Sequence, residues 1–94
     1  MIEATGGVGS TAFTAIGTVF RTLPDDIRSQ VTAMSATSAN DVTLTLGGTG
    51  TDIVWGNADE SAKKAIVLAA AMRARPPADV YSYDVSAPGA AVIR

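Results

Sequence analysis

The sequence has no cysteine and no histidine among its 94 residues. Imidazole and thiolate groups are therefore missing, which excludes Ser–His–Asp and Cys–His nucleophilic centres, the common zinc sites and disulfide cross-links. A chain without cysteine fits either a reducing or an extracytoplasmic setting. We expect no cofactor and no bound metal.

Aromatic residues are scarce, and positive charge is not in excess. The five aromatic residues are Phe13, Phe20, Trp55, Tyr81 and Tyr83. Lys and Arg total 7 against 9 Asp and Glu, a formal net charge of −2, so the sequence lacks the basic excess that binds a phosphate backbone. We therefore expect no nucleic-acid partner. The length predicts one small domain with a thin core, which buries roughly 60–65% of the surface that the unfolded chain exposes.

No long apolar run is present either. The longest uncharged run, Ala4 to Phe20, contains four glycines and many threonines, so it is not apolar enough to span a bilayer. The chain also does not begin with a basic segment followed by an apolar one, so a signal or anchor would belong to a longer parent protein. We expect this chain itself to be soluble.

Apolar residues between Thr11 and Thr22 recur at three- and four-residue steps and predict a helix, which Ser10 can cap. Its expected buried stripe is Ala12, Ile16, Val19, Phe20 and Leu23. Pro24 ends this helix, and Asp25-Asp26 suit the first turn of a short helical segment that follows, to about residue 30.

The segment 61–75 has no Gly or Pro and predicts the second main helix. Asn57 and Glu60, spaced by three, resemble a capping box. The expected buried stripe is Ala62, Ala65, Leu68, Ala69 and Met72. Lys63 and Lys64 are expected to form a solvated pair.

Alternation of apolar and polar residues predicts strands, most clearly where Val42, Leu44 and Leu46 alternate with threonines. Trp55 is expected in the core. The expected strands are 31–37, 42–46, 51–56, 80–85 and 90–93. The fold class is therefore α+β: a mostly antiparallel sheet with two main helices on one face, in the order helix, three strands, helix, two strands. Residues 1–9 are expected to be a flexible Gly-rich lead-in with one short extended piece, and residues 10–94 a single domain.

Four patterns are candidate sites. The Gly-rich segment 6–11 precedes a helix like a phosphate-binding loop but lacks its lysine, and a plain lead-in ending in a helix cap explains it better. The paired carboxylates Asp25-Asp26 and Asp59-Glu60 suit helix starts rather than acid–base catalysis. Asp84 lies inside a predicted strand, where a solvated position or a loop-capping acceptor is favoured over a catalytic role.

The end of the chain is the fourth pattern. The short apolar run Ala90 to Ile93 suits a sheet edge, where unpaired N–H and C=O groups can template an incoming strand. The alternative is a strand that is covered or too short to do so. Tyr81 and Tyr83 suit a core or a partner interface equally well.

Several runs of residues, taken in order, are similar to a known family. These are the segments 41–46 and 53–56, the positions Ala58, Ser61, Lys64-Ala65 and Val67-Leu68, the stretch Tyr83-Asp84-Val85-Ser86-Ala87-Pro88, and upstream Leu23-Pro24, Arg28 and Val31. Together they resemble the extracytoplasmic β domain of the bacterial cell-division FtsQ (DivIB) family, actinobacterial type. The resemblance covers 20–94.

This resemblance implies a parent protein with one transmembrane helix, a small domain beyond it and then this β domain outside the cell membrane at the division septum. It implies no enzymatic activity and no small-molecule substrate. The implied partners are bitopic division proteins of the FtsB/DivIC and FtsL types, bound by β-strand addition at the last strand, which helps control septal peptidoglycan synthesis. The implied partner-binding residues are Tyr81, Tyr83, Ala87, Gly89, Ala90, Ala91, Val92 and Ile93.

Two other classes remain open at this stage. One is a small-ligand or phosphate-binding enzyme fragment that uses the Gly-rich start or the scattered carboxylates. The other is a structural module whose edge strand pairs with a second copy of itself.

Overall fold

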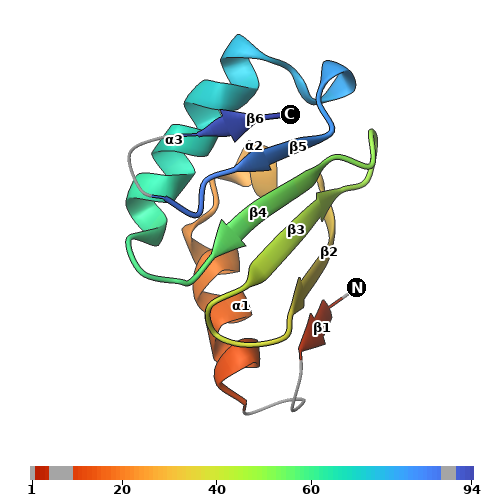
Figure 1. The fold of residues 1–94 in the computed structure, drawn as a ribbon. Helices are drawn as coiled ribbons and strands as arrows, with labels where there is room; N and C mark the ends of the chain where they lie inside the picture. The colour runs from red at the N-terminus through yellow and green to blue at the C-terminus, as the bar shows by residue number, and fades with distance from the viewer. Residues whose placement is uncertain (1, 5–9, 88–90) are drawn as a thin grey trace.

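The computed structural model of the protein describes residues 2–4, 10–87 and 91–94. Figure 1 shows the elements in these ranges, which follow the chain in this order: β1 (Ile2–Ala4), α1 (Thr11–Thr22), α2 (Asp25–Arg28), β2 (Val31–Ala36), β3 (Val42–Leu46), β4 (Asp52–Gly56), α3 (Ser61–Ala74), a 3₁₀ turn η1 (Pro77–Asp79), β5 (Ser82–Asp84) and β6 (Val92–Ile93).

The strands of the described ranges form one six-stranded sheet in the order β1-β2-β3-β4-β5-β6. The β2–β3, β3–β4 and β5–β6 pairings are antiparallel, whereas β1–β2 and β4–β5 are parallel. The predicted α+β class and the predicted order of helices and strands are confirmed. The short extended piece expected near the start is β1; residues 5–9 of the Gly-rich lead-in lie outside the described residues.

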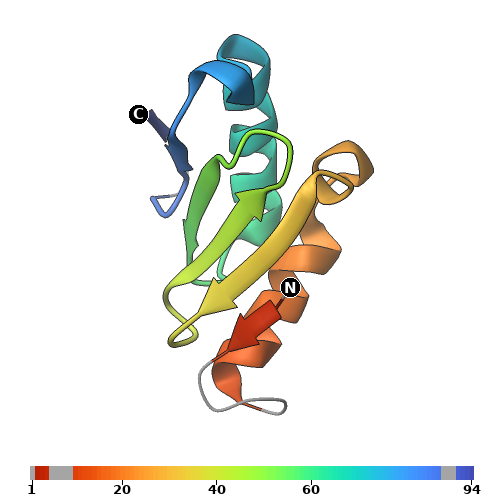
Figure 2. The same ribbon diagram turned by 90° about the vertical axis from the view of Figure 1, so that its right-hand side faces the viewer.

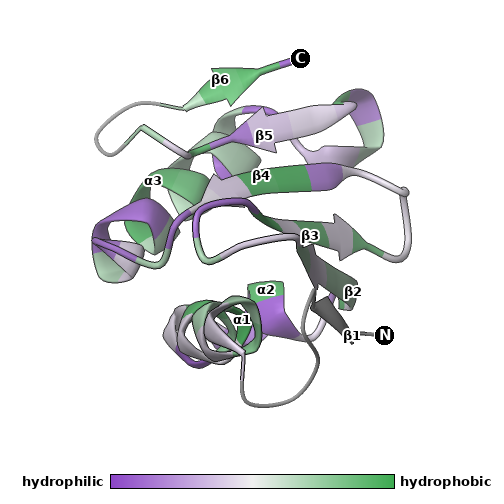
Figure 3. Ribbon diagram, turned by 60° about the horizontal axis from the view of Figure 1, so that its bottom comes forward, coloured by the Kyte–Doolittle hydropathy of each residue, from purple (hydrophilic) through white to green (hydrophobic). Residues whose placement is uncertain are grey.

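Both main helices lie against the same face of the sheet, as the view along the layers shows (Figure 3). α1 contacts β1, β2 and β3 and also packs on α3. The chain connects the parallel strands β4 and β5 through α3, which lies on the other half of the sheet (Figure 2). The opposite sheet face carries no helix among the described elements and presents threonines such as Thr43 and Thr45, which are half-buried.

The core lies between the helices and the sheet. Trp55 is fully buried, as predicted, and its ring nitrogen donates to Ser61 Oγ at 3.3 Å. The stripe predicted for α1 is buried with one exception, because Phe20 stays 39% exposed. Phe20 and Phe13 are close in angle on the flank of the helix, whereas Ala12, Ile16 and Val19 face the sheet.

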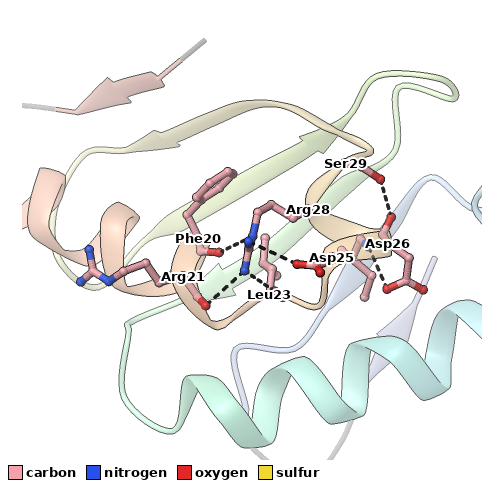
Figure 4. Close-up of polar contacts among 8 residues, drawn as sticks. Phe20, Arg21, Leu23, Asp25, Asp26, Arg28 and Ser29 are labelled. Atoms are coloured by element: carbon pink, nitrogen blue, oxygen red, sulfur yellow. Dashed lines mark hydrogen bonds and ion pairs between the residues drawn. The ribbon is translucent and has the colours of Figure 1, made fainter.

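The C-terminal end of α1 is capped by a side chain from α2 (Figure 4). The guanidinium of Arg28 donates to the carbonyl oxygens of Phe20 at 3.2 Å, Arg21 at 3.3 Å and Leu23 at 2.9 Å. It also lies 5.4 Å from the centre of the Phe20 ring. The carbonyl of Phe20 also accepts the N–H of the C-cap residue Leu23 at 3.3 Å, and Arg28 adds a donor to acceptors at the end of α1, where the last carbonyls lack the regular helix partner.

α3 corrects three predictions. Its buried residues are Ser61, Lys64, Ala65, Leu68 and Ala71, whereas Ala62 is exposed and Ala69 and Met72 are half-buried. Lys64 is therefore not part of a solvated pair. The predicted capping box is also absent: the N-cap is Glu60, in the left-handed conformation at φ 56°, without a side-chain cap bond.

Candidate partner-binding edge

β6 is the last strand of the sheet, and within the described ranges no strand pairs with its outer side. On its inner side Tyr83 lies opposite Ile93 and Asp84 opposite Val92. The pairing extends to Arg94, which donates its N–H to Ser82 O at 3.0 Å and accepts from Ser82 N at 3.4 Å and from Tyr81 N at 2.8 Å. The edge position predicted for the last strand is confirmed.

The hydrogen bonds of Arg94 determine which backbone groups face outward. Arg94 and Ser82 exchange both bonds, and in an antiparallel ladder such pairs alternate with pairs that exchange none. Ile93 precedes Arg94 and is paired with Tyr83, so the N–H and C=O of Ile93 point away from β5 toward the open side. The same alternation, continued two residues back, gives Ala91 the same outward orientation.

The two candidate tyrosines have separate positions. Tyr83 is fully buried and its hydroxyl donates to the carbonyl oxygen of Arg75, so it holds β5 against the end of α3 rather than offering a surface to a partner. Burial also raises the pKa of Tyr83. Tyr81 is 89% exposed. The predicted alternation fails here because β5 begins only at Ser82, after the turn that follows η1.

The other predicted site residues lie along the edge or just before it. Ala87 is exposed, Ala91 and Ile93 are half-buried against the core, and Val92 is 49% exposed. Gly89 and Ala90 lie outside the described residues. Tyr81 and Val92 are thus two of the four large hydrophobic side chains that the described part of the chain exposes, and both lie at this edge.

Asp84 belongs to the edge, although it was not among the predicted partner-binding residues. Its Oδ1 accepts from Ser86 N at 3.0 Å and from Ser86 Oγ at 2.6 Å, and its Oδ2 lies 3.6 Å from a guanidinium nitrogen of Arg94. Hydrogen bonds from Ser86, followed by the charge of Arg94, lower the pKa of the Asp84 carboxyl. The loop-capping acceptor that the sequence offered as an alternative is the one found.

Gly56, the last residue of β4, lies close to the turn that follows β5. Its φ is +81°, and a Cβ built there would lie 3.0 Å from Ser86 Cβ. A side chain at position 56 would therefore be strained and would also press against Ser86. Glycine lets the end of β4 and the turn after β5 approach each other.

The carboxylate pairs do not converge. Asp25 and Asp26 lie in the first turn of α2, whereas Asp59 and Glu60 precede α3. Ser10 caps α1 by accepting from Phe13 N at 3.1 Å, and residues 6–9 of the Gly-rich segment lie outside the described ranges. No cluster of three or more acidic residues that could hold a metal ion occurs in the part of the chain that the structure describes. None of the described helices is both long and apolar enough to cross a bilayer.

A curated protein is similar in sequence to most of the chain. The chain is 36% identical over 75 residues to the cell division protein FtsQ of Streptomyces bingchenggensis. The matched stretch makes up 80% of this chain and 27% of that protein, so the chain spans about a quarter of the length of the curated relative it matches. No family model matches the chain.

Proposed function

We propose that this chain is an FtsQ-type β domain, formed by residues 10–94, that acts as a non-catalytic scaffold in cell division. The similarity to a cell division protein supports the biological role. The observation that carries the molecular role is the open outer side of β6, where the N–H and C=O of Ile93 have no strand beside them in the described structure.

In this proposal the edge captures an extended segment of a bitopic division protein of the FtsB/DivIC type, with an FtsL-type protein in the same complex. Strand addition takes its affinity from main-chain hydrogen bonds and its selectivity from alternate side chains. The domain lies on the outer side of the cell membrane at the septum, as part of a longer membrane-anchored protein, and the capture helps control septal peptidoglycan synthesis.

The two faces of β6 define what the captured segment carries. Residues of the captured segment that lie beside Ile93 are on the face toward α3. Ala91 and Val67 are half-buried against the core there, so these partner residues are apolar. Residues of the captured segment that lie beside Val92 and Arg94 are on the helix-free face. There the Arg94 side chain is 58% exposed, which favours a polar or acidic residue in the partner.

The expected affinity is modest. β6 has two residues, so an added strand forms only a few backbone hydrogen bonds, each contributing about 0.5–1.5 kcal/mol. The interface is therefore near the small end of the range for specific complexes, below roughly 1,200 Å² in total.

The test is capture of a synthetic peptide that spans the extracytoplasmic part of an FtsB/DivIC-type protein, measured by biolayer interferometry. Ala91→Pro removes an outward N–H, and an edge strand tolerates proline where the N–H faces solvent. We expect capture to weaken about tenfold, the equivalent of roughly 1.4 kcal/mol, with an unchanged circular dichroism spectrum. Ala91→Ser keeps the N–H and is the matched control.

Equal capture by Ala91→Pro and wild type, with intact spectra, would remove β6 as the docking strand. Absence of capture by wild type would remove the proposed function. Size-exclusion chromatography at several concentrations tests whether the edge pairs with a second copy of the chain, which would replace partner capture by self-association.

A further inference from the structure

Strand addition requires a receiving strand with a fixed register. β6 has two residues, which are too few to fix its register by backbone pairing alone. β5 ends at Asp84 and β6 begins at Val92, so seven residues, 85–91, connect them. Tight turns set the register of a hairpin, whereas a connection of this length does not. Other contacts must therefore hold β6 in place.

The register matters because a slip of one residue exchanges the two faces of a strand. Ile93, now half-buried against the core, would move to the helix-free face, and the exposed Val92 would move under α3. The outward N–H and C=O groups would then belong to different residues, and the side-chain pattern presented to a partner would be reversed.

We infer that Asp84 is the positioning residue that holds β6 in the register a partner strand needs, through Ser86 at the start of the connection and Arg94 at the end of the strand. This inference rests on the proposed function of the edge. One carboxylate oxygen accepts two hydrogen bonds from Ser86, at 3.0 and 2.6 Å, and the other faces Arg94 at 3.6 Å. Asp84 thus contacts the start of the seven-residue connection and the residue after β6.

The surroundings of Asp84 make its contribution specific. Its neighbour on β4 is Val54, which carries no charge, and on β6 the charged group that faces it is Arg94. The Asp84 side chain is 24% exposed, whereas its hydrogen bonds with Ser86 lie at the surface. Gly56 brings β4 within contact of Ser86, so the turn that Asp84 closes also rests on the sheet.

The experiment measures amide hydrogen exchange of Arg94, whose N–H donates to Ser82 O, together with capture of the FtsB/DivIC-type peptide. For Asp84→Ala we expect exchange of this amide to be about tenfold faster and capture about tenfold weaker, because the turn at Ser86 and Arg94 lose the carboxylate that both contact. Asp84→Asn keeps an acceptor for Ser86 and should recover part of both. Asp52→Ala is the matched control, because it removes an exposed carboxylate from β4 that contacts Thr45.

The protection of the Arg94 amide should also depend on pH. Because the pKa of Asp84 is lowered from 3.8, its stabilising effect is present above that value and is lost as the pH falls through the folded-state pKa. Wild type should show this loss of protection below pH 3.8, and Asp84→Asn should not.

The two proposals fail in different ways. If wild type captures the peptide and Asp84→Ala changes neither exchange nor capture, the positioning role is wrong and the docking edge stands. If Asp84→Ala speeds exchange but wild type captures no peptide, the role in register stands and the proposed function is wrong. Ser86→Ala, which removes only the hydroxyl donor, gives a second and milder variant should Asp84→Ala unfold.

Discussion

Replacing Lys64 by methionine should destabilise the domain. Lys64 is fully buried, and its ammonium donates to Trp55 O at 3.1 Å, to Asn57 O at 2.9 Å and to Asn57 Oδ1 at 3.0 Å. An ammonium has three protons, so each has an acceptor. These bonds attach the loop between β4 and α3, which contains the left-handed Glu60, to the first turns of the helix.

The magnitude follows from two opposing effects. Each hydrogen bond to a charged group contributes about 1.5–3 kcal/mol, and the carbonyls left behind would lose their partner. Burial, however, lowers the pKa of Lys64 against the opposing charges of Asp59 and Glu60, so desolvation of the ammonium offsets part of this gain. We expect a net loss of about 2–4 kcal/mol, because methionine retains most of the aliphatic stem.

A loss of this size is a large fraction of the roughly 5–14 kcal/mol typical of a domain of this length. Equilibrium urea unfolding, followed by the fluorescence of Trp55 and by circular dichroism, measures it. Lys63→Met is the control, since Lys63 is the exposed neighbour on the same helix and the chemical change is identical. If the two variants unfold within about 0.5 kcal/mol of each other, the size of ordinary surface effects, the reasoning about the Lys64 contacts is wrong.

Two further substitutions test the parts of the fold that lead to the edge. Arg28→Gln should lower the free energy of unfolding by about 1–2 kcal/mol because the last carbonyls of α1 lose their donor; an unchanged thermal midpoint would show that water replaces Arg28 without cost. Gly56→Ala should cost about 1–2 kcal/mol from its positive φ plus the contact with Ser86, whereas Gly50→Ala, at φ +72° with nothing within 4 Å, should cost the first part alone. Equal losses in urea unfolding would mean that Ser86 moves away freely.

The elements with strong periodicity were predictable. Val42, Leu44 and Leu46 alternate with threonines, and β3 has the predicted bounds, with all three buried. Ser10 and Pro24 border α1, where a side-chain cap and a fixed φ leave few alternatives. In both cases the apolar side chains are large enough that only one orientation buries them.

The orientation of α3 was not predictable from its pattern. The helix is rich in alanine, and a small side chain gains little from burial. Rotating α3 about its axis, so that the neighbouring residues are buried instead, therefore changes the free energy of folding little. The observed orientation brings Lys64 to its acceptors on Trp55 and Asn57, and a periodicity argument does not include such contacts. A long aliphatic stem also lets lysine pass through the core to reach carbonyls at its border.

The docking edge was predictable in position but not in detail. Small apolar residues after Pro88-Gly89 indicate a terminal strand, and β6 is one. Which backbone groups face outward depends on the hydrogen bonds of Arg94 with Ser82. The role of Asp84 depends on its contacts with Ser86 and Arg94, which only the folded structure shows. Tyr81 and Tyr83, two residues apart, differ in exposure because the strand begins between them.

The strand order places the first and last strands of the chain on opposite borders of the sheet. Five spacings of about 4.8 Å separate them, or roughly 24 Å. A fluorophore, surface linker or fused protein joined ahead of β1 would therefore leave the far border clear. Immobilising the domain through that end gives every molecule on a sensor the same accessible side, so a weak interaction can be measured without the attachment itself competing for it.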